Sequence, residues 1–257
     1  MRYTEAPARR AELLRRLETT GYVSSAQLAN ELGVSEMTIR RDVRQLQLEG
    51  LARRVAGGAA IVGGMTFDER THEGADEKRA IAQACAPLLA GAATIALDAG
   101  TTVAPVVELI AAGTTVVSHS VPVISACTQR DDLELIGIGG VYQSGTRSFA
   151  GPGARAAVQD FSLDVAVLSA TAIDADGIRC ANVLDAEMKR QMSACAALTI
   201  VLADHAKLEA RAPIRVGPVT LADILVTDAR ASAGRLDEIR AAGVRVVVAD
   251  DEASAAI

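Results

Sequence analysis

The stretch VSSAQLANELGVSEMTIRRDVRQLQLEGLARRVAGGA, residues 23–59, decides how the N-terminal part of this 257-residue chain folds. Ser24 can cap a helix whose apolar residues repeat at helical spacing until Gly33 stops it. Ser35 can then cap a second helix over residues 36–49. A turn of very few residues therefore joins the two helices.

The flanking sequence adds one helix before this pair and a hairpin after it. Residues 8–19 predict a helix, because Ala11, Leu14 and Leu17 recur at helical spacing and charged residues fill the other face. Residues 51–61 alternate loosely in hydrophobicity around a Gly-Gly pair and predict a β-hairpin. Three helices followed by a hairpin are the elements of a winged helix-turn-helix, which would form a small α+β head.

The helix over residues 36–49 carries the candidate DNA contacts. Ile39, Val43 and Leu46 are spaced i, i+4, i+7 and should face the other helices, so the polar residues point away. The start of such a helix can reach base edges in the major groove, and flanking arginines can contact phosphates. Each arginine alone could be a solvated surface charge, but the set favours DNA. Asp42 can pair with a neighbouring arginine and fix its direction. The candidate DNA-binding residues are Ser35, Thr38, Arg40, Arg41, Arg44, Arg53 and Arg54.

The distribution of charge supports a DNA partner, although the net charge of −6 alone would argue against one. Residues 1–60 hold ten Arg and seven acids, a balance of +3, which leaves 16 basic and 25 acidic residues, a balance of −9, for the rest. A basic head on an acidic body is typical of a DNA reader with a separate second domain. Aromatic residues make up only 2% of the chain, which argues against recognition of single strands by stacking.

A second domain is predicted over residues 76–257, after a polar linker over 62–75 that follows a head of residues 1–61. It opens with a helix over 76–90. Apolar runs rich in β-branched residues then alternate with helical stretches, which indicates an α/β fold with a mainly parallel, Rossmann-like sheet covered on both faces. The predicted strands are 94–97, 115–118, 133–138, 164–169, 199–203, 223–227 and 244–249.

A candidate ligand site follows the first of these strands. Asp98, Gly100, Thr101 and Thr102 lie just past its carboxyl end, which is where parallel sheets bind ligands. Gly100 would let the backbone approach a ligand closely, and free amides at the start of an expected helix, with the threonine hydroxyls, suit a phosphate. Asp98 could accept hydrogen bonds from sugar hydroxyls. A plain strand-to-helix turn can look similar, so both interpretations remain open at this point.

The sequence resembles the DeoR family of bacterial transcription regulators over roughly residues 8–249. In the head the matching motifs are T-I-R-R-D at 38–42, L-x-x-x-G-L at 46–51 and R-x-x-G-G-A at 54–59. In the body the matches lie at 77–82, 98–102, 139–140, 149–152, 174–177, 187–190 and 203–207. The resemblance implies a sensor domain similar in fold to ribose-5-phosphate isomerase and the CoA-transferases.

The resemblance also implies a set of effector-binding residues. Lys207 would supply a cation for a phosphate, and one of Glu187 and Lys189 could reach the site while the other forms a structural ion pair. His119 could read a hydroxyl or cap the next helix. The full set is Asp98, Gly100, Thr101, Thr102, His119, Glu187, Lys189 and Lys207.

Two positions that border this site depart from the family pattern. Ser118-His119-Ser120 stands where the family usually has Thr-Asn-Ser, and Ser169-Ala170 stands where a glycine is common. Both departures bear on which ligand the site would take.

These features predict a repressor of a carbohydrate or polyol operon that a phosphorylated sugar or polyol releases from double-stranded operator DNA. Palindromic operators favour an even number of heads, so we expect a homo-dimer or homo-tetramer. The alternative is an isomerase-like enzyme with an accessory head, in which Asp98, Glu187 and Lys207 would be acid/base candidates. The three histidines lack the spacing of metal ligands, and no cofactor motif is present.

Cysteine usage and hydropathy indicate the compartment. Cys85, Cys127, Cys180 and Cys195 are scattered, as expected for free thiols in a reducing cytosol. The sequence has no apolar run long enough for a membrane helix. We therefore expect a soluble, cytoplasmic protein.

Overall fold

The computed structural model describes residues 6–20, 22–49, 51–55, 58–61 and 67–249. The chain divides into two compact units, Met1–Arg70 and Thr71–Ile257. Each unit has its own hydrophobic core, and the two are described separately below.

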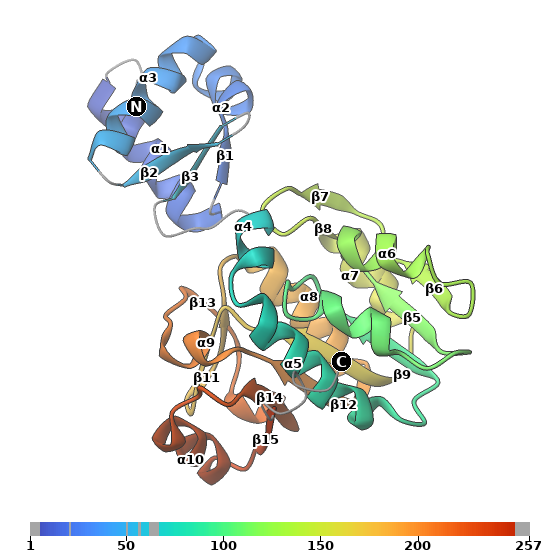
Figure 1. The fold of residues 1–257 in the computed structure, drawn as a ribbon. Coiled ribbons are helices and arrows are strands. Elements are labelled where there is room, and N and C mark those ends of the chain that lie inside the picture. The colour runs from blue at the N-terminus through green and yellow to red at the C-terminus, as the bar shows by residue number, and fades with distance from the viewer. Residues whose placement is uncertain (1–5, 21, 50, 56–57, 62–66, 250–257) are drawn as a thin grey trace. The chain divides into compact units, whose positions relative to one another are not determined.

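The smaller unit is a winged helix-turn-helix (Figure 1). Its helices are α1 (Ala6–Thr20), α2 (Ser25–Leu32) and α3 (Glu36–Leu48), and its strands are β1 (Tyr22–Ser24), β2 (Ala52–Val55) and β3 (Gly58–Ile61). The strands pair antiparallel in the order β1-β3-β2, so the predicted hairpin is present and gains a third strand that the sequence did not predict. Buried side chains from all three helices hold the unit together: Leu13, Leu17, Leu28, Ile39, Val43 and Leu46.

The predicted helix boundaries follow from capping. The Ser35 hydroxyl accepts a hydrogen bond from the amide of Thr38 at 3.2 Å, and Ser24 does the same for Gln27 at 3.4 Å. Gly33 ends α2 in the left-handed region at φ 65°, where a side chain would be strained. The tip of the hairpin, predicted at Gly57-Gly58, lies partly outside the described residues.

The inward face of helix α1 is shifted slightly from the predicted one: Leu17 and Leu14 contact the core as predicted, and Leu13 joins them in place of Ala11. Leu13 and Leu17 are fully buried, Leu14 is half-buried and Ala11 is exposed. The i, i+4 pair of leucines defines the buried stripe, and a small alanine at its margin carries little weight in that choice.

Residues 67–72 form helix α4 (Phe67–His72), although the sequence assigned them to the linker over 62–75. Asp68 and Glu69 occupy its first turn, where negative charge stabilises a helix, and Phe67 is buried. The division between the two units falls inside the same segment, after Arg70.

The larger unit is built on a seven-stranded sheet in the order β15-β14-β12-β9-β4-β5-β6. Every neighbouring pair in it is parallel. Its strands match the seven predicted ones within a few residues: β4 (Thr94–Leu97), β5 (Thr115–Ser118), β6 (Glu134–Gly137), β9 (Leu163–Ser169), β12 (Ala196–Leu202), β14 (Ile224–Asp228) and β15 (Arg245–Ala249).

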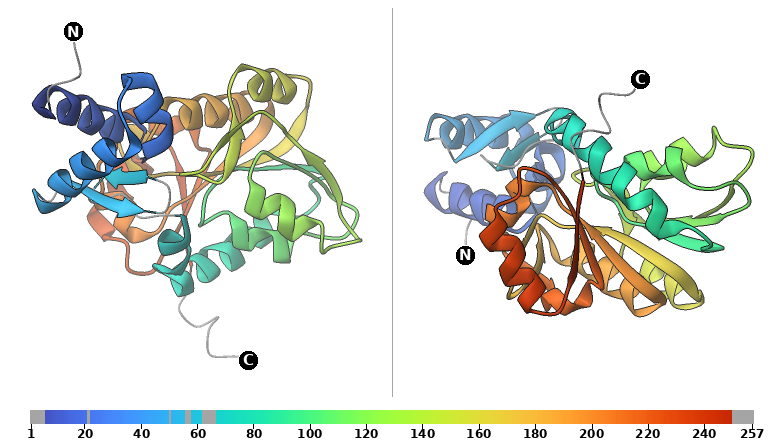
Figure 2. Two further views of the ribbon diagram at one scale, coloured as in Figure 1. Left: turned by 90° about the horizontal axis from the view of Figure 1, so that it is seen from above. Right: turned by 60° about the horizontal axis from the view of Figure 1, so that its bottom comes forward.

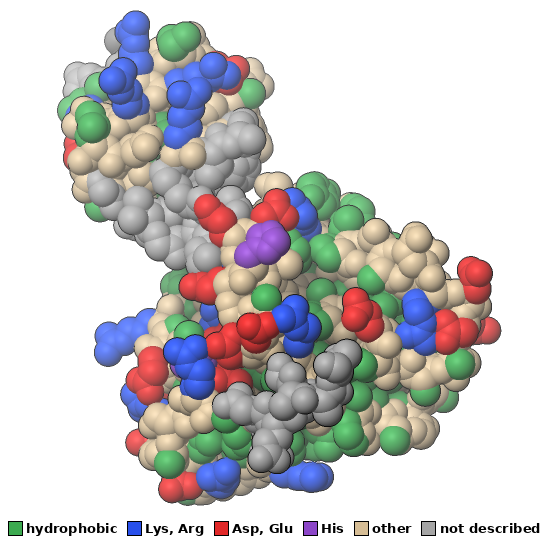
Figure 3. Space-filling view, viewed as in Figure 1, with side chains coloured by type: hydrophobic (Ala, Val, Ile, Leu, Met, Phe, Trp, Pro, Cys, Tyr) green, Lys and Arg blue, Asp and Glu red, His purple; other side chains and the backbone are tan. Residues whose placement is uncertain are grey.

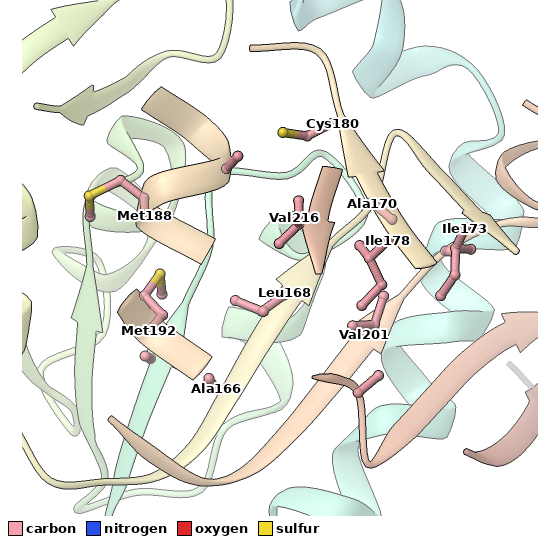
Figure 4. Close-up of a cluster of buried hydrophobic side chains, with 14 of the residues drawn as sticks. Ala166, Leu168, Ala170, Ile173, Ile178, Cys180, Met188, Met192, Val201 and Val216 are labelled. Carbon is pink, nitrogen blue, oxygen red and sulfur yellow. The ribbon is translucent and has the colours of Figure 1, made fainter. Parts of the chain in front are cut away.

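Helices cover both faces of this sheet (Figure 2). One face packs against α5 (Ala75–Cys85), the 3₁₀ turns η1 (Ala86–Leu89) and η2 (Ala104–Leu109), and α6 (Val121–Cys127). The other packs against α7 (Pro152–Gln159), α8 (Val183–Ala194), α9 (His205–Glu209) and α10 (Ala233–Ala241). Figure 4 shows part of this second core, with Met188 and Met192 on α8 and Leu168 on β9.

Short antiparallel strands that the sequence did not predict decorate the sheet. Two form a ribbon, β7 (Val141–Gln143) and β8 (Ser148–Ala150). Three others form a small sheet in the order β10-β11-β13, from β10 (Ala172–Asp174), β11 (Gly177–Cys180) and β13 (Ile214–Gly217). A further 3₁₀ turn, η3 (Val219–Leu221), precedes β14.

The strand order reverses between β4 and β9. From β4 the sheet grows through β5 to β6, and from β9 it grows the other way through β12 and β14 to β15. Such a switch point opens a crevice at the carboxyl ends of the two central strands, which is where open α/β sheets bind ligands. Asp98 follows β4 and Ser169 ends β9, so both lie at this edge.

Candidate functional site

Helix α3 presents its arginines to solvent. Ile39 and Val43 are buried in the core, whereas Arg40, Arg41 and Arg44 are exposed on the opposite face. Figure 3 shows basic side chains gathered on one face of this unit. The division between an apolar and a basic face is the one that the helical spacing predicts.

The candidate DNA-binding side chains differ in whether they already have partners within the protein. Arg40 is held by Glu36 one turn earlier, with 2.6 Å between guanidinium and carboxylate. Arg41 and Arg44 form no ion pair with any residue that the structure describes. The hydroxyls of Ser35 and Thr38 hydrogen-bond each other at 2.8 Å at the start of the helix.

The two hairpin arginines lie on β2. Arg54 is exposed, and the side chain of Arg53 lies outside the described residues. Met37 is a further exposed residue of α3, at 58%, that the sequence analysis passed over. An exposed apolar side chain at the start of a recognition helix suits contact with a thymine methyl group.

Asp42 pairs with Arg9 of α1. The sequence had suggested a neighbouring arginine as its partner, and this prediction was wrong. The guanidinium grips the carboxylate with two nitrogens, Nε to Oδ2 and Nη2 to Oδ1, the second at 3.2 Å. Both side chains are buried. A bidentate pair of this kind fixes the orientation of α3 on α1.

At the switch point of the larger unit, Asp98 is the centre of a buried polar network. It is fully inaccessible, and protein groups engage both of its carboxylate oxygens. Oδ1 lies 3.3 Å from His119 Nε2, and Oδ2 accepts hydrogen bonds from the amide and hydroxyl of Ser169 at 2.9 and 2.7 Å. The ammonium of Lys189 also bonds Oδ2. The buried carboxylate therefore holds His119, Ser169 and Lys189 together.

Lys189 reaches this carboxylate from α8, on one face of the sheet. Its ammonium also lies 3.3 Å from Asp185, one turn earlier on the same helix. Burial alone would lower the pKa of Lys189, but the carboxylates of Asp185 and Asp98 hold it above its usual range. Burial alone would raise the pKa of Asp98, but Lys189 and His119 hold it well below its usual range. Both groups of the pair are thus charged at neutral pH.

For Asp185 the effect of burial prevails over the nearby ammonium, and the pKa of this carboxyl lies above its usual value. Its Oδ1, the atom 3.3 Å from the Lys189 ammonium, is buried and forms an ion pair there but no hydrogen bond of good geometry with a described residue. Its position four residues before Lys189 is the spacing of helical ion pairs, a signal that the sequence carried and the prediction did not use.

His119 follows β5 and contacts Asp98 from the side. Its Nδ1 lies 2.9 Å from the carbonyl oxygen of Phe149 and its Nε2 faces Asp98. The ring therefore lies between a backbone carbonyl oxygen and a carboxylate oxygen. Of the two roles considered for His119, the cap belongs to Ser120, whose hydroxyl accepts from the amide of Val123 at the start of α6.

The loop after Asp98 is a turn and a 3₁₀ helix, where a regular helix was expected. The amides of Val103 and Ala104 both donate to the carbonyl of Gly100 at 3.1 Å, which closes the turn. Pro105 lies near the start of η2. Thr101 is half-buried and Thr102 is buried, and neither amide bonds a described residue.

Gly100 makes room for the side chain of Ser169. A Cβ placed on it would lie 2.3 Å from the Cβ of Ser169, so the side chain of Ser169 rests directly on the Gly100 backbone. From the sequence we expected a ligand, and not a side chain of the protein, to approach the Gly100 backbone. Ser169 was not among the predicted site residues, although it was noted as a departure from the family pattern.

Lys207 and Glu187 lie apart from the buried network. Lys207 is on α9, which follows β12 at the same sheet edge, and Glu187 is on α8, two residues before Lys189. Both are half-buried, and neither forms an ion pair with the residues described. Next to Lys207, His205 Nδ1 lies 3.0 Å from the buried carboxylate of Asp228.

Family models match both units of the chain. One described as the DeoR-like helix-turn-helix domain matches residues 9–63, and one described as the DeoR C terminal sensor domain matches residues 73–229. The chain belongs to the DeoR family. The matched ranges include α3 and the residues of the buried network.

Relatives are similar along most of their length. The transcriptional repressor CsqR of Escherichia coli K12 is 31% identical, over 95% of this chain and 96% of the relative. The transcriptional regulator GlpR of Haloferax volcanii is 32% identical over 86% and 89%. The glycerol-3-phosphate regulon repressor of Escherichia coli K12 is 27% identical over 81% and 85%. All three are named as transcriptional regulators and not as enzymes.

Solved structures give only distant likenesses. Ribose 5 phosphate isomerase A from Neisseria gonorrhoeae aligns with a TM-score of 0.37 and 14% identity, over 51% of this chain and 52% of that one. A likeness at this level says nothing about activity.

Within the described residues, no helix has both the length and the apolar character needed to cross a membrane.

Proposed function

We propose that this DeoR-family protein represses an operon of carbohydrate or polyol catabolism and leaves its operator when a phosphorylated sugar or polyol binds the larger unit. Residues 1–61 would read DNA, 62–75 would link the units and 76–257 would sense the effector. The protein would act in the cytoplasm as a homo-dimer or homo-tetramer, because palindromic operators need an even number of heads.

The exposed face of α3 supports the DNA half of this proposal. Thr38 and Arg40 lie in its first turns, where base edges come within reach, and Arg41 and Arg44 are free to bond phosphates. Ser35 would contact the backbone next to the helix start, and Arg53 and Arg54 would follow the backbone from the hairpin.

The charged network at the switch point is the observation that carries the sensing half. A ligand at this edge would meet the loop of Gly100, Thr101 and Thr102, whose amides suit a phosphate or hydroxyl, and Lys207 would add a cation. Asp98, His119 and Lys189 would hold this surface in place from below, and Glu187 would meet ligand hydroxyls from α8. Differential affinity of a few kcal/mol is enough to couple the ligand to DNA release.

The DNA half is tested by anisotropy titrations of the full chain on DNA from upstream of its own gene, at several salt concentrations. Arg44→Ala should weaken binding and reduce the salt slope by about 1, as loss of one phosphate contact does. Unchanged affinity and slope would remove Arg44 from the interface. Arg235→Ala, an exposed arginine of α10, is the matched control.

The sensing half is tested by thermal shift with sugar and polyol phosphates and their unphosphorylated parents. A ligand at 100 times its Kd should stabilise the fold by about 2.7 kcal/mol. We expect a response to one phosphorylated compound and its loss in Lys207→Ala. Equal responses to the parent compounds would rule out a phosphate-reading site.

A further inference from the structure

Ser169 is less buried than the three ionisable groups that meet at Asp98. Asp98, Lys189 and His119 are each at most 1% exposed, whereas Ser169 is half-buried. A ligand that arrives from solvent therefore meets Ser169 before it can meet the charges beneath it.

The hydroxyl of Ser169 lies between two opposite charges. It donates to Asp98 Oδ2 at 2.7 Å and accepts from the ammonium of Lys189 at 3.1 Å. A hydroxyl has one proton and two lone pairs, so these two bonds leave a single acceptor site. A hydroxyl of a sugar or polyol in the same place would make the same two bonds, with its own proton and one lone pair.

The space that Ser169 fills is bounded on the other side by Gly100. The Ser169 Cβ and Oγ lie 2.3 and 2.4 Å from where a Gly100 Cβ would be. A glycine at position 169 would leave two facing backbones with no side chain between them. The gap would hold roughly the two heavy atoms removed, which is enough for a water molecule or one hydroxyl-bearing carbon.

We propose that Ser169 occupies the position of a ligand hydroxyl and thereby sets how far an effector can extend toward Asp98 and Lys189. The proposal rests on the proposed sensing function and assigns its specificity. The natural effector is then a phosphorylated polyol or sugar whose chain ends at Ser169. Ser169→Gly opens the position to a compound longer by one hydroxyl-bearing carbon.

The test is calorimetric titration of the full chain with polyol phosphates that form a series differing by one hydroxymethylene unit. We expect Ser169→Gly to change the ratio of Kd between the natural ligand and the next longer compound by about tenfold or more, since hydrogen bonds to charged groups are among the stronger ones. Ser169→Ala removes the hydroxyl but keeps the Cβ, so it should weaken binding without this change of preference.

Ser162→Gly is the matched control, because Ser162 is exposed and lies at the amino end of β9, the end opposite Ser169. The ratio of Kd should stay as in the unmodified protein. An unchanged ratio in Ser169→Gly, or a changed ratio in Ser169→Ala, would overturn the proposal while leaving the proposed function intact.

A crystal structure of Ser169→Gly decides the matter even if no polyol phosphate binds, an outcome that would contradict the proposed effector class. We expect a water molecule within hydrogen-bond distance of both Asp98 and Lys189. Collapse of the Gly100 loop into the gap would show that no ligand position lies there.

Discussion

Asp98 and Lys189 meet where solvent scarcely reaches, so each depends on the other for its charge. Removing one partner of a buried ion pair leaves the other uncompensated, and this typically costs about 3–5 kcal/mol. Lys189→Met should lower the free energy of unfolding in urea by this order. Arg235→Ala breaks an exposed pair with Glu209 and should leave it nearly unchanged. Equal effects of the two substitutions would mean that the buried pair is not a pair in solution.

The same carboxylate gives stability a defined dependence on pH. The pKa of Asp98 is depressed in the fold, so its contribution is present above the unfolded value, about 4, and is lost as pH falls below it. The difference in unfolding free energy between the unmodified protein and Asp98→Asn should therefore be largest near pH 6 and shrink below pH 4. Asp185, whose pKa is raised first by burial and also by the charge of Asp98, has the opposite trend in the unmodified protein. A constant difference from pH 6 to pH 3 would contradict the assignment.

The sequence located this site but not its contacts. The position of Asp98 after a buried strand was enough to place it at the sheet edge, because parallel strands share that edge. Which groups would satisfy it was not accessible, since Lys189 lies 91 positions and Ser169 71 positions away along the chain. We expected Asp98 to accept hydrogen bonds from sugar hydroxyls. In the structure its carboxylate accepts them from Ser169 and from Lys189 of α8 instead.

At the scale of elements, the buried pair between α1 and α3 is what orients the recognition helix. Asp42→Asn keeps the shape of the side chain but removes its charge and leaves Arg9 buried beside a weaker acceptor. We expect weaker operator binding with an unchanged salt slope, because Asp42 is too buried to touch a phosphate. The measurement is anisotropy at several salt concentrations.

The sign of this effect separates positioning from simple electrostatics. Asp42→Asn makes the head more positive, which on its own would strengthen binding to DNA. Glu36→Gln, on the exposed side of the same helix, makes the same change of charge without disturbing Arg9, and should bind DNA at least as well as the unmodified protein. Stronger binding by Asp42→Asn would show that the pair does not position the helix.

Elements differed in how well the sequence predicted them, for reasons of length and burial. Strands such as Leu163–Ser169 are apolar runs buried on both faces, and these stand out in any window. Ribbon strands such as Val141–Gln143 have three residues and exposed side chains, so they exist through pairing and not through pattern. Helix α4 was missed because six residues carry almost no periodicity.

For the whole molecule, the two units have cores that share no residue. The core of the head lies within residues 13–59, and the cores of the larger unit lie within 81–248. Residues 71–257 alone should therefore unfold in one cooperative transition at a Tm close to that of the corresponding transition in the full chain. Differential scanning calorimetry of both proteins would check this. A fragment with no transition would show that the head is required for the larger unit to fold.

The reversal of strand order also determines when the sheet can close during synthesis. Its central pair joins Thr94 to Asp164 across 70 positions, and the carboxylate of Asp164 accepts from the Thr94 amide at 2.9 Å. At about 5–20 residues per second, the ribosome needs roughly 4–14 s to make the chain between these strands. For that interval β4 has an unpaired edge, which is a template for wrong partners. Outward from β9, the strands β12, β14 and β15 lie in the sheet in the same order as along the chain.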